Sequence, residues 1–222
     1  ERCINEGKIT KGLCRKPEDA SWLKNKGVEI FAGDLLNLEE LEIAFMNCNI
    51  VVHTAGWSGS TEVPAELAWR TNVQGTINVV EAAKKSRVER LIYISSIAVY
   101  GLNKTPLINE SMETPEVGEL YPDSKIEAER IVRTSGIPYV IIRPGSIYGP
   151  RGKGWTIGIL EQLKKGQLIL GNGNGKITPG YIHNFIDGLW LCMYNINALG
   201  KTFNICDADV MTYNQFYLRY AK

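Results

Sequence analysis

The chain has 222 residues, enough for one substantial core, because domains commonly run to roughly 100–200 residues. Apolar residues make up 44% and charged residues 22%, which is ordinary globular usage and excludes wholesale disorder. The formal net charge is +1 and no basic block is present, so the electrostatic footprint of a nucleic-acid binder is missing and we expect a small-molecule partner.

The lengths of the apolar runs and the number of cysteines indicate in which environment the chain works. The longest apolar runs fall far short of the roughly 20 residues that cross a bilayer, and no signal-peptide pattern opens the chain. We therefore expect no membrane association and a cytoplasmic location. The five cysteines are odd in number, contain no C-x-x-C pair and are accompanied by only two histidines. This pattern predicts neither a disulfide framework nor a metal site.

Short β-rich runs alternate with helical stretches along the chain. The runs are apolar throughout, as strands buried on both faces of a parallel sheet must be. We therefore predict an α/β fold with a doubly wound, Rossmann-like parallel sheet, in which each interval is long enough for a right-handed crossover helix. The predicted strands are Ile9 to Arg15, Val28 to Ala32, Ile50 to His53, Arg90 to Ser95 and Tyr139 to Arg143.

Both ends of the chain look interrupted. ERCINEGK resembles the last turns of a helix that ends at Gly7, where a left-handed cap suits glycine. A doubly wound dinucleotide fold opens with a strand and a glycine-rich turn, so we expect that roughly 15–25 preceding residues are missing. TYNQFYLRYAK predicts a final helix that is cut short without a cap.

The character of the sequence changes after Pro150, where glycine becomes dense and the strands short. We expect residues 1–150 to form a dinucleotide-binding domain, incomplete at its N-terminus. Residues 151–222 should form a small C-terminal substrate lobe, incomplete at its end and interleaved with the first unit. The GNGNG segment, Gly171 to Gly175, is interpreted as a turn in this lobe and not as a phosphate loop, because Pro179 stands where a helix would be needed.

The strongest constellation is YISSIAVYG, Tyr93 to Gly101, followed by YPDSK, Tyr121 to Lys125. Tyr121 and Lys125 stand four residues apart, so on a helix both project from one face. A nearby ammonium and a cationic nicotinamide together favour the phenolate, which should lower the pKa of Tyr121 toward the working range. Ser96 ends a predicted strand, at the sheet edge where such folds place their ligands. A carbonyl held by Ser96 and Tyr121 can accept hydride, so we assign catalysis to Ser96, Tyr121 and Lys125.

These segments resemble those of the extended short-chain dehydrogenase/reductases, the NAD-dependent epimerase/dehydratase superfamily. The resemblance spans essentially the whole chain, and its six pieces stand in family order. They are GDL (Gly33 to Leu35), VVHTAG (Val51 to Gly56), TNVQGT (Thr71 to Thr76), SSIAVYG, YPDSK and RPGSIYGP (Arg143 to Pro150).

The resemblance implies a set of cofactor contacts. Asp34 and Leu35 would flank the adenine, although Asp34 could equally cap a helix over Leu38 to Phe45. Small residues after the third predicted strand would let backbone approach the ribose and diphosphate; they are Thr54, Ala55 and Gly56.

Further residues around the expected site have supporting roles. Asn72 would tie backbone together beside the site, and Pro144 and Ile147 would shape the nicotinamide pocket. Arg143 is interpreted as a strand-end charge. His53 is interpreted as a packing residue in preference to a catalytic one.

The cofactor is expected to be NADP, with NAD as the alternative. The end of the second strand of a dinucleotide fold meets the adenine ribose, where a carboxylate suits NAD and an arginine suits the 2′-phosphate. Here Cys14 or Arg15 falls at that position, and no acidic residue follows before Glu18. The alternative is an exposed Arg15 paired with Glu18 or Asp19.

Three reactions compete within the resemblance. A nucleotide-sugar dehydratase is disfavoured, because Ile97 and Ala98 stand where the Asp/Glu pair of such enzymes is expected. A nucleotide-sugar epimerase would have an arginine near Pro179, so the segment Pro179 to Trp190 resembles more closely the dihydroflavonol reductase and 3β-hydroxysteroid dehydrogenase branch. A carbonyl reductase or alcohol dehydrogenase is the first expectation, the epimerase the second, and a non-catalytic cofactor-binding protein the third.

Homodimerisation is also expected from the resemblance, through helices around Ala65 to Lys84 and Ser124 to Arg133. Ile126, Ala128 and Val132 would supply the apolar contacts.

Overall fold

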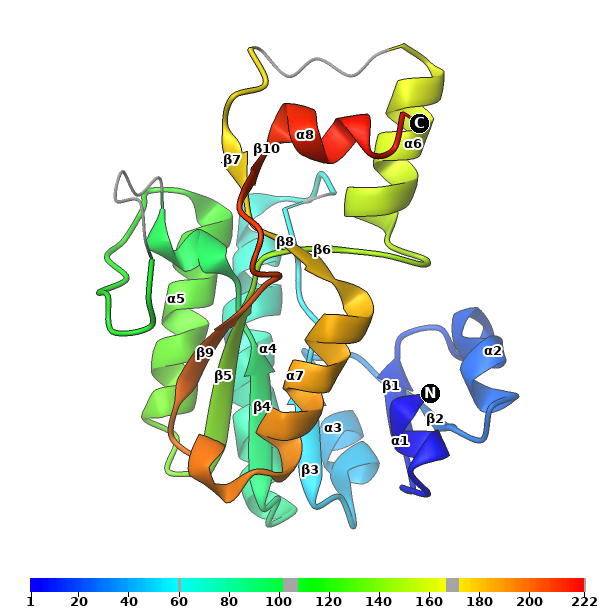
Figure 1. Ribbon diagram of the computed structural model, residues 1–222. Coiled ribbons are helices and arrows are strands. Elements are labelled where there is room, and N and C mark those ends of the chain that lie inside the picture. Colours follow the sequence, from blue (N-terminus) through cyan, green and yellow to red (C-terminus); the bar gives the residue numbers. More distant parts are fainter. Residues whose placement is uncertain (60, 102–107, 167–171, 222) are drawn as a thin grey trace.

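The computed structural model describes residues 1–59, 61–101, 108–166 and 172–221. Its centre is a parallel sheet with strand order β3-β4-β5-β9 (Figure 1). These strands are β3 (Ile50–His53), β4 (Arg90–Ile94), β5 (Tyr139–Pro144) and β9 (Thr202–Ile205). A second parallel pair joins β1 (Lys11–Cys14) to β2 (Glu29–Ala32). The predicted α/β class with a parallel sheet is confirmed.

Eight α-helices lie within the described residues, some of them crossing over between these strands and others at the chain ends or in the lobe. They are α1 (Arg2–Asn5), α2 (Ser21–Lys24), α3 (Leu38–Phe45), α4 (Ala65–Lys85), α5 (Leu120–Arg133), α6 (Ile159–Lys164), α7 (Ile182–Tyr194) and α8 (Tyr213–Leu218). Short 3₁₀ turns are η1 (Pro17–Ala20), η2 (Ile97–Tyr100) and η4 (Ile196–Ala198), and η3 (Lys153–Gly158) is a π-helix.

Both faces of the central sheet are buried, which explains why its strands are apolar throughout. Leu91 and Tyr93 of β4 join a core cluster with α3, α4 and α5, whereas Ile92 points to the other face, where Phe185 and Met193 of α7 cover it. The two faces therefore take alternate residues of the same strand. Figure 1 shows α7 crossing this second face of the sheet.

A third, smaller cluster lies beyond the sheet. Two short strand pairs hold it, the parallel pair β6 (Ser146–Tyr148) with β8 (Pro179–Tyr181) and the antiparallel pair β7 (Lys176–Ile177) with β10 (Met211–Thr212). α6 and α8 pack over them around Ile159 and Phe216. Because β9 and α7 return to the main sheet, the lobe is built from separate stretches, and a division of the chain at residue 150 stays a proposal.

Gly145 stands where the chain leaves the main sheet for the lobe. A β-carbon at this position would lie 2.2 Å from the backbone oxygen of Thr178. The same oxygen accepts a hydrogen bond of 2.9 Å from the amide of Ser146. Only glycine permits so close a backbone approach, which fixes how β6 departs from β5.

Several predicted boundaries need correction. Ile9 is 94% exposed and precedes β1, which begins at Lys11 and ends at Cys14. The final helix begins with a capping box between Thr212 and Gln215 and ends at Leu218 instead of running to the end of the chain. The first helix ends before Gly7, which has the expected positive φ of 68°. Of the predicted GNGNG turn, residues 172 and 173 form a turn and a bend, residues 174 and 175 are irregular, and Gly171 lies outside the described residues.

The expected dimer contacts are wrong in part. Ala128 and Val132 are fully buried in the core of the chain itself, because they face the sheet from α5. Ile126 is half-buried on the same helix and is the one expected contact that keeps exposed surface.

Candidate functional site

Ser96 lies two residues after the end of β4 and directly before the 3₁₀ turn η2. Its Oγ accepts a hydrogen bond of 3.1 Å from the amide of Ala98, which caps the turn. A hydroxyl that accepts in this way still has its own proton to donate. The side chain therefore offers a donor at the carboxyl edge of a parallel strand, where ligands of such sheets bind.

Lys125 joins α5 to the same strand end. Its side chain is 7% exposed, and Nζ donates a hydrogen bond of 3.0 Å to the backbone oxygen of Ile94, two residues before Ser96. Tyr121 lies one helical turn earlier, and its pKa is affected by a hydrogen bond with Ser96. The structure thus brings the three residues of the predicted constellation together, from a strand end and one helix face.

The two titratable groups are shifted by burial. Burial raises the pKa of the Tyr121 phenol, and the hydrogen bond with Ser96 opposes that rise only in part. Burial also lowers the pKa of Lys125 to about 8, against the opposite pull of the Glu129 carboxylate. In the protein alone desolvation dominates, so the Lys125 ammonium by itself does not lower the Tyr121 pKa; the expected lowering with a cationic nicotinamide beside it stays a prediction. Tyr121 is a protonated phenol at neutral pH.

Asn72, on α4, connects the backbone on both sides of the site. Its Oδ1 accepts from the amide of Trp57 at 2.7 Å, and its Nδ2 donates to the Trp57 oxygen at 3.0 Å. Nδ2 also donates to the Ser124 hydroxyl at 2.8 Å, and Ser124 in turn donates to the backbone oxygen of Tyr121 at 2.8 Å. One side chain thus links the segment after β3 to the start of α5, as its expected tying role requires.

Thr54, Ala55 and Gly56 follow β3 and are exposed. A β-carbon on Gly56 would lie 2.8 Å from the Asn72 Oδ1 and 3.8 Å from the Lys125 Nζ. The absence of that side chain keeps space open beside a buried ammonium that has two N–H groups beyond the one bonded to Ile94. Ribose hydroxyl oxygens can accept from such N–H groups, so Lys125 and Gly56 fit the ribose of a nicotinamide dinucleotide.

Asp34 and Leu35 lie after β2 and face α3 and α4. Asn37, not Asp34, caps α3 by accepting from the amides of Glu39 and Glu40, so the alternative role expected for Asp34 is wrong. The Oδ1 of Asp34 instead accepts from the amide of Leu36 at 2.9 Å in a local turn. Leu35 packs against Gly75, where a β-carbon would come within 3.1 Å of it.

The remaining expected contacts lie at two edges of the site. Arg15 is exposed directly after β1, and within the described chain no ion pair joins it to Glu18 or Asp19. Pro144 ends β5 opposite Ile205 of β9. Ile147 of β6 packs in part against the second core cluster, so only a portion of its surface can face a ligand.

His53 is a buried, neutral packing residue in this structure. Its Nε2 lies 3.1 Å from the Thr76 hydroxyl. Since that hydroxyl donates to the backbone oxygen of Asn72 at 2.6 Å, it accepts from an Nε2–H of His53. Burial, together with the charge of Lys125, lowers the pKa of His53 to about 3.

Arg143 differs most from its sequence interpretation. It is 2% exposed and not a simple strand-end charge, because its guanidinium forms a buried ion pair with Glu129 of α5. The signal that could have revealed this pair is spacing. Glu129 stands four residues after Lys125 and eight after Tyr121, so it shares their helix face and needs a partner inside the protein.

Membrane spans and metal clusters are both missing from the described residues. None of the helices in those ranges combines the length and apolarity needed to span a membrane. Over the same ranges, no group of three or more His, Cys, Asp or Glu side chains is placed to hold a metal ion.

Curated relatives of the chain include epimerases and dehydrogenases. It is 31% identical to the uncharacterized protein y4nL of Sinorhizobium fredii over 92% of this chain and 60% of that protein. It is 30% identical to N-acetyl-α-D-glucosaminyl-diphospho-ditrans,octacis-undecaprenol 4-epimerase of Escherichia coli O157:H7, over 82% and 57% of the two chains. It is 28% identical to the human decarboxylating sterol-4-α-carboxylate 3-dehydrogenase, over 88% and 56%. The chain thus spans roughly three fifths of the length of these relatives.

Solved structures show the same fold. The enzyme WbmG of Bordetella bronchiseptica in complex with NAD superposes with a TM-score of 0.84 at 25% identity, covering 99% of this chain and 72% of that one. The UDP-glucose 4-epimerase of Thermus thermophilus, also in complex with NAD, gives a TM-score of 0.83 at 23% identity, covering 99% and 76%.

The family model supplies the assignment. Residues 1–206 match the model described as the NAD dependent epimerase/dehydratase family. That range contains the parallel sheet as well as Ser96, Tyr121 and Lys125. The chain belongs to the NAD dependent epimerase/dehydratase family.

Proposed function

We propose that the protein is a nicotinamide-dependent oxidoreductase that transfers hydride between the cofactor and a carbonyl or secondary alcohol. The observation that carries the proposal is the convergence of Ser96, Tyr121 and Lys125. The Lys125 hydrogen bond to Ile94 brings α5 to the end of β4, and Ser96 lies near enough to Tyr121 to lower the pKa of its phenol against the effect of burial. Two hydroxyl donors then face one ligand position, which suits a single carbonyl oxygen.

Each side chain has a distinct chemical role in this proposal. The Ser96 hydroxyl donates to the carbonyl oxygen and orients it. Tyr121 gives its phenolic proton to that oxygen while the carbonyl carbon gains hydride, so that the product is a secondary alcohol and the balancing species is the phenolate. The nicotinamide, when bound, supplies the hydride. Lys125 holds a ribose hydroxyl and stabilises the phenolate by its charge.

The protonation state of Tyr121 favours one direction. Since burial raises the phenol pKa, the proton donor is present at neutral pH, and carbonyl reduction needs no prior deprotonation. Oxidation of the alcohol needs the phenolate and should therefore become faster as the pH rises.

Arg15 supports NADP as the cofactor of this reaction. The residue is exposed directly after β1 and no ion pair engages it within the described chain, so its guanidinium is available for the forked contact that suits a 2′-phosphate. NAD remains the alternative, and it is the nucleotide present in the WbmG structure.

Nucleotide-sugar epimerisation is the second candidate, and the 30% identity to a 4-epimerase favours it. Against it stands Pro179, buried in β8, near which an epimerase is expected to carry an arginine for the diphosphate. Neighbouring Thr178, Gly180 and Tyr181 are not arginines either, so this segment supplies no guanidinium to a nucleotide.

The deciding experiment uses the full-length protein with NADPH or NADH. Apolar ketones and nucleotide sugars are added separately while the nicotinamide absorbance is followed. A reductase consumes reduced cofactor with a ketone, whereas an epimerase converts a nucleotide sugar with no net absorbance change. Loss of the signal in the Tyr121→Phe variant assigns it to this site. Absence of any turnover, with cofactor binding intact, would contradict the proposal and favour a non-catalytic binding protein.

A homodimer through the outer faces of α4 and α5 is part of the same proposal. Leu67 and Trp69 of α4 are exposed, and Ile126 of α5 is half-buried. These apolar side chains would be covered by the same helices of a second copy. Light scattering at micromolar concentration is expected to give twice the monomer mass, and a monomer alone would contradict the dimer.

A further inference from the structure

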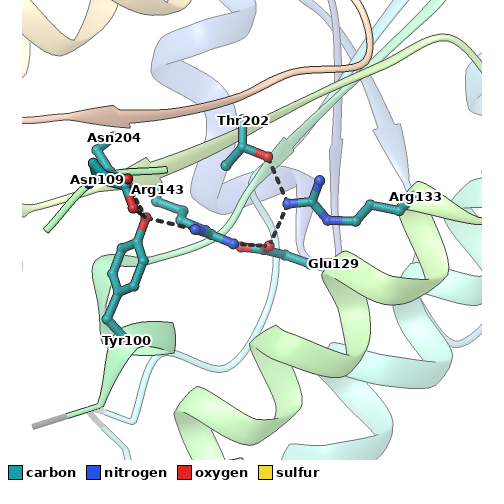
Figure 2. A network of polar contacts seen from close by, with 7 residues as sticks. All are labelled: Tyr100, Asn109, Glu129, Arg133, Arg143, Thr202 and Asn204. Carbon is teal, nitrogen blue, oxygen red and sulfur yellow. Dashed lines mark hydrogen bonds and ion pairs between the residues drawn. The ribbon is translucent and has the colours of Figure 1, made fainter. Parts of the chain in front are cut away.

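The buried guanidinium of Arg143, on β5, uses three of its nitrogen atoms as hydrogen-bond donors. Nε and Nη2 of Arg143 donate to the two oxygens of Glu129 at 2.8 and 2.7 Å, and Nη1 donates to the Tyr100 hydroxyl at 2.7 Å (Figure 2). The plane of the Tyr100 ring also lies near the guanidinium, with 4.8 Å from Cζ to the ring centroid. Arg143 thus holds two partners at once, in one rigid planar fork.

The two partners come from the two elements that carry the proposed catalytic residues. Glu129 lies on α5, two turns after Tyr121 and one turn after Lys125. Tyr100 is the last residue of η2, the turn that begins directly after Ser96. α5 and η2 are also neighbours in the fold. A single side chain of β5 therefore bridges the element of Ser96 and the element of Tyr121.

Tyr100, at the η2 end of this set of contacts, has further hydrogen-bond partners. The single proton of the Tyr100 hydroxyl has two acceptors within reach, the Asn204 Oδ1 at 2.9 Å and the Asn109 backbone oxygen at 3.2 Å. Figure 2 shows Tyr100, Arg143 and Glu129 in one line of contacts that runs from η2 to α5.

Glu129, at the α5 end of these contacts, is also bound by a second arginine. Arg133 donates to Glu129 at 3.2 Å and to the Thr202 hydroxyl of β9 at 2.7 Å. It reaches neither η2 nor Tyr100.

We propose that Arg143 is a positioning residue that sets the separation between Ser96 and Tyr121, by holding Tyr100 and Glu129 simultaneously. The inference rests on the proposed function, in which those two hydroxyls share one carbonyl oxygen. A buried ion pair is a weak source of net stability, because desolvation offsets the attraction, and its better attested use is to fix one geometry. A displacement of about 1 Å at a reacting group can lower the rate by about 100-fold.

The test compares variants of the full-length protein that keep the fold and the ring packing. Tyr100→Phe removes only the hydroxyl that receives Arg143, and Arg143→Lys keeps the charge but cannot hold both partners. Arg133→Gln is the matched control, since it removes an ion pair to the same Glu129 without touching η2. Amide hydrogen exchange reports on residues 97–101 and 120–125, and steady-state kinetics report on turnover and on the cofactor KM.

Tyr100→Phe and Arg143→Lys should each increase exchange in both segments and lower kcat by about 10- to 100-fold. The cofactor KM should change less than about twofold, because Lys125 keeps its hydrogen bond to Ile94. Arg133→Gln should leave kcat and the exchange of residues 97–101 as in the wild type.

Two outcomes would overturn the inference. In the first, amide exchange in the Tyr100→Phe variant increases in residues 97–101 but not in residues 120–125. That result would show that Arg143 does not couple η2 to α5, whether or not the enzyme is active. The other is an active wild type whose kcat Tyr100→Phe leaves unchanged. Coupled exchange in a protein that turns over no carbonyl, alcohol or nucleotide sugar would support the link and overturn the proposed function instead.

Discussion

The ammonium of Lys125 lies over the ring of Tyr93, with 5.0 Å between Nζ and the ring centroid. Both side chains are buried, and the Tyr93 hydroxyl has no hydrogen-bond partner among the described residues. The face of the Tyr93 ring attracts a cation. Even so, this ring and one backbone oxygen stabilise the Lys125 ammonium less than its hydration in water does. The pKa of about 8 expresses this imbalance, which is mainly desolvation. The molecule keeps a charge in the interior at a cost in stability.

Lys125→Met should therefore stabilise the fold while it abolishes activity. The Lys125 pKa falls from 10.5 to about 8 on folding, and one pKa unit corresponds to about 1.4 kcal/mol, so the gain at pH 7 should be at most about 3 kcal/mol. Urea unfolding of variant and wild type measures it.

The pH dependence supplies the control for this variant. Because the folded pKa of Lys125 is depressed, the wild type loses stability as the pH falls from 10.5 to about 8. The advantage of Lys125→Met should be full below pH 8 and vanish near pH 10.5. An advantage that is equal at both pH values would contradict burial as its cause.

Tyr121→Phe tests the proton donor. Because only a hydroxyl is removed, folding and cofactor affinity should stay nearly intact, whereas turnover of the full-length enzyme should fall by a factor on the order of 10²–10⁴. Steady-state kinetics and a cofactor titration separate the two effects. A variant that keeps more than half of the wild-type turnover would refute the role of Tyr121.

His53 should make the fold sensitive to acid. Its folded pKa is about 3 against an ordinary value of 6.5, so its stabilising contribution is complete above pH 6.5 and is lost as the pH falls toward 3. The slope can reach about 1.4 kcal/mol per pH unit.

His53→Gln is the matched variant, because its amide can still donate to Thr76. Its unfolding free energy should be flatter than that of the wild type between pH 6.5 and 4.5, a window above the ordinary carboxyl range. Parallel curves for the two proteins would show that His53 is not buried as a neutral ring.

Arg15→Ala tests the cofactor preference of the full-length enzyme. A charge-assisted contact from the guanidinium to a phosphate is worth roughly 1.5–3 kcal/mol, or about 10- to 100-fold in affinity. The Kd of NADP should rise by that factor, and the Kd of NAD should not change. Equal affinities for both nucleotides in the wild type, unaltered by the substitution, would refute the assignment.

The sequence was sufficient to predict three of the four central strands, β3, β4 and β5, and the proximity of Ser96, Tyr121 and Lys125, whereas β9 was missed; the reasons for the successes are local. Ile92 and Ile142 lie in continuous apolar runs that only a doubly covered sheet explains, and the spacing of Tyr121 and Lys125 already determines a shared helix face. What it could not predict depends on tertiary contacts. Whether Arg143 is exposed or paired is decided by a helix that lies on its strand from another part of the chain.

The predictions of the α3 cap and of the exposed face of α5 were wrong for a related reason. Asp34 and Asn37 are both good capping residues, and the choice of Asn37 depends on where the chain turns after β2. Ala128 and Val132 are apolar residues of a helix whose inner and outer faces the sequence cannot orient, and the structure places both inside.

The pairing of β5 with β9 joins Ile141 to Thr202, with β6, α6, β7, β8 and α7 lying between them in sequence. Parallel contacts between such distant segments form slowly, because the intervening loop must close first. During synthesis, the outer edge of β5 stays unpaired until Thr202–Ile205 has left the ribosome, and an open parallel edge can recruit a foreign strand. Until β9 is made, β5 therefore presents an unpaired parallel edge, so mispairing with another chain is most expected in this interval of synthesis.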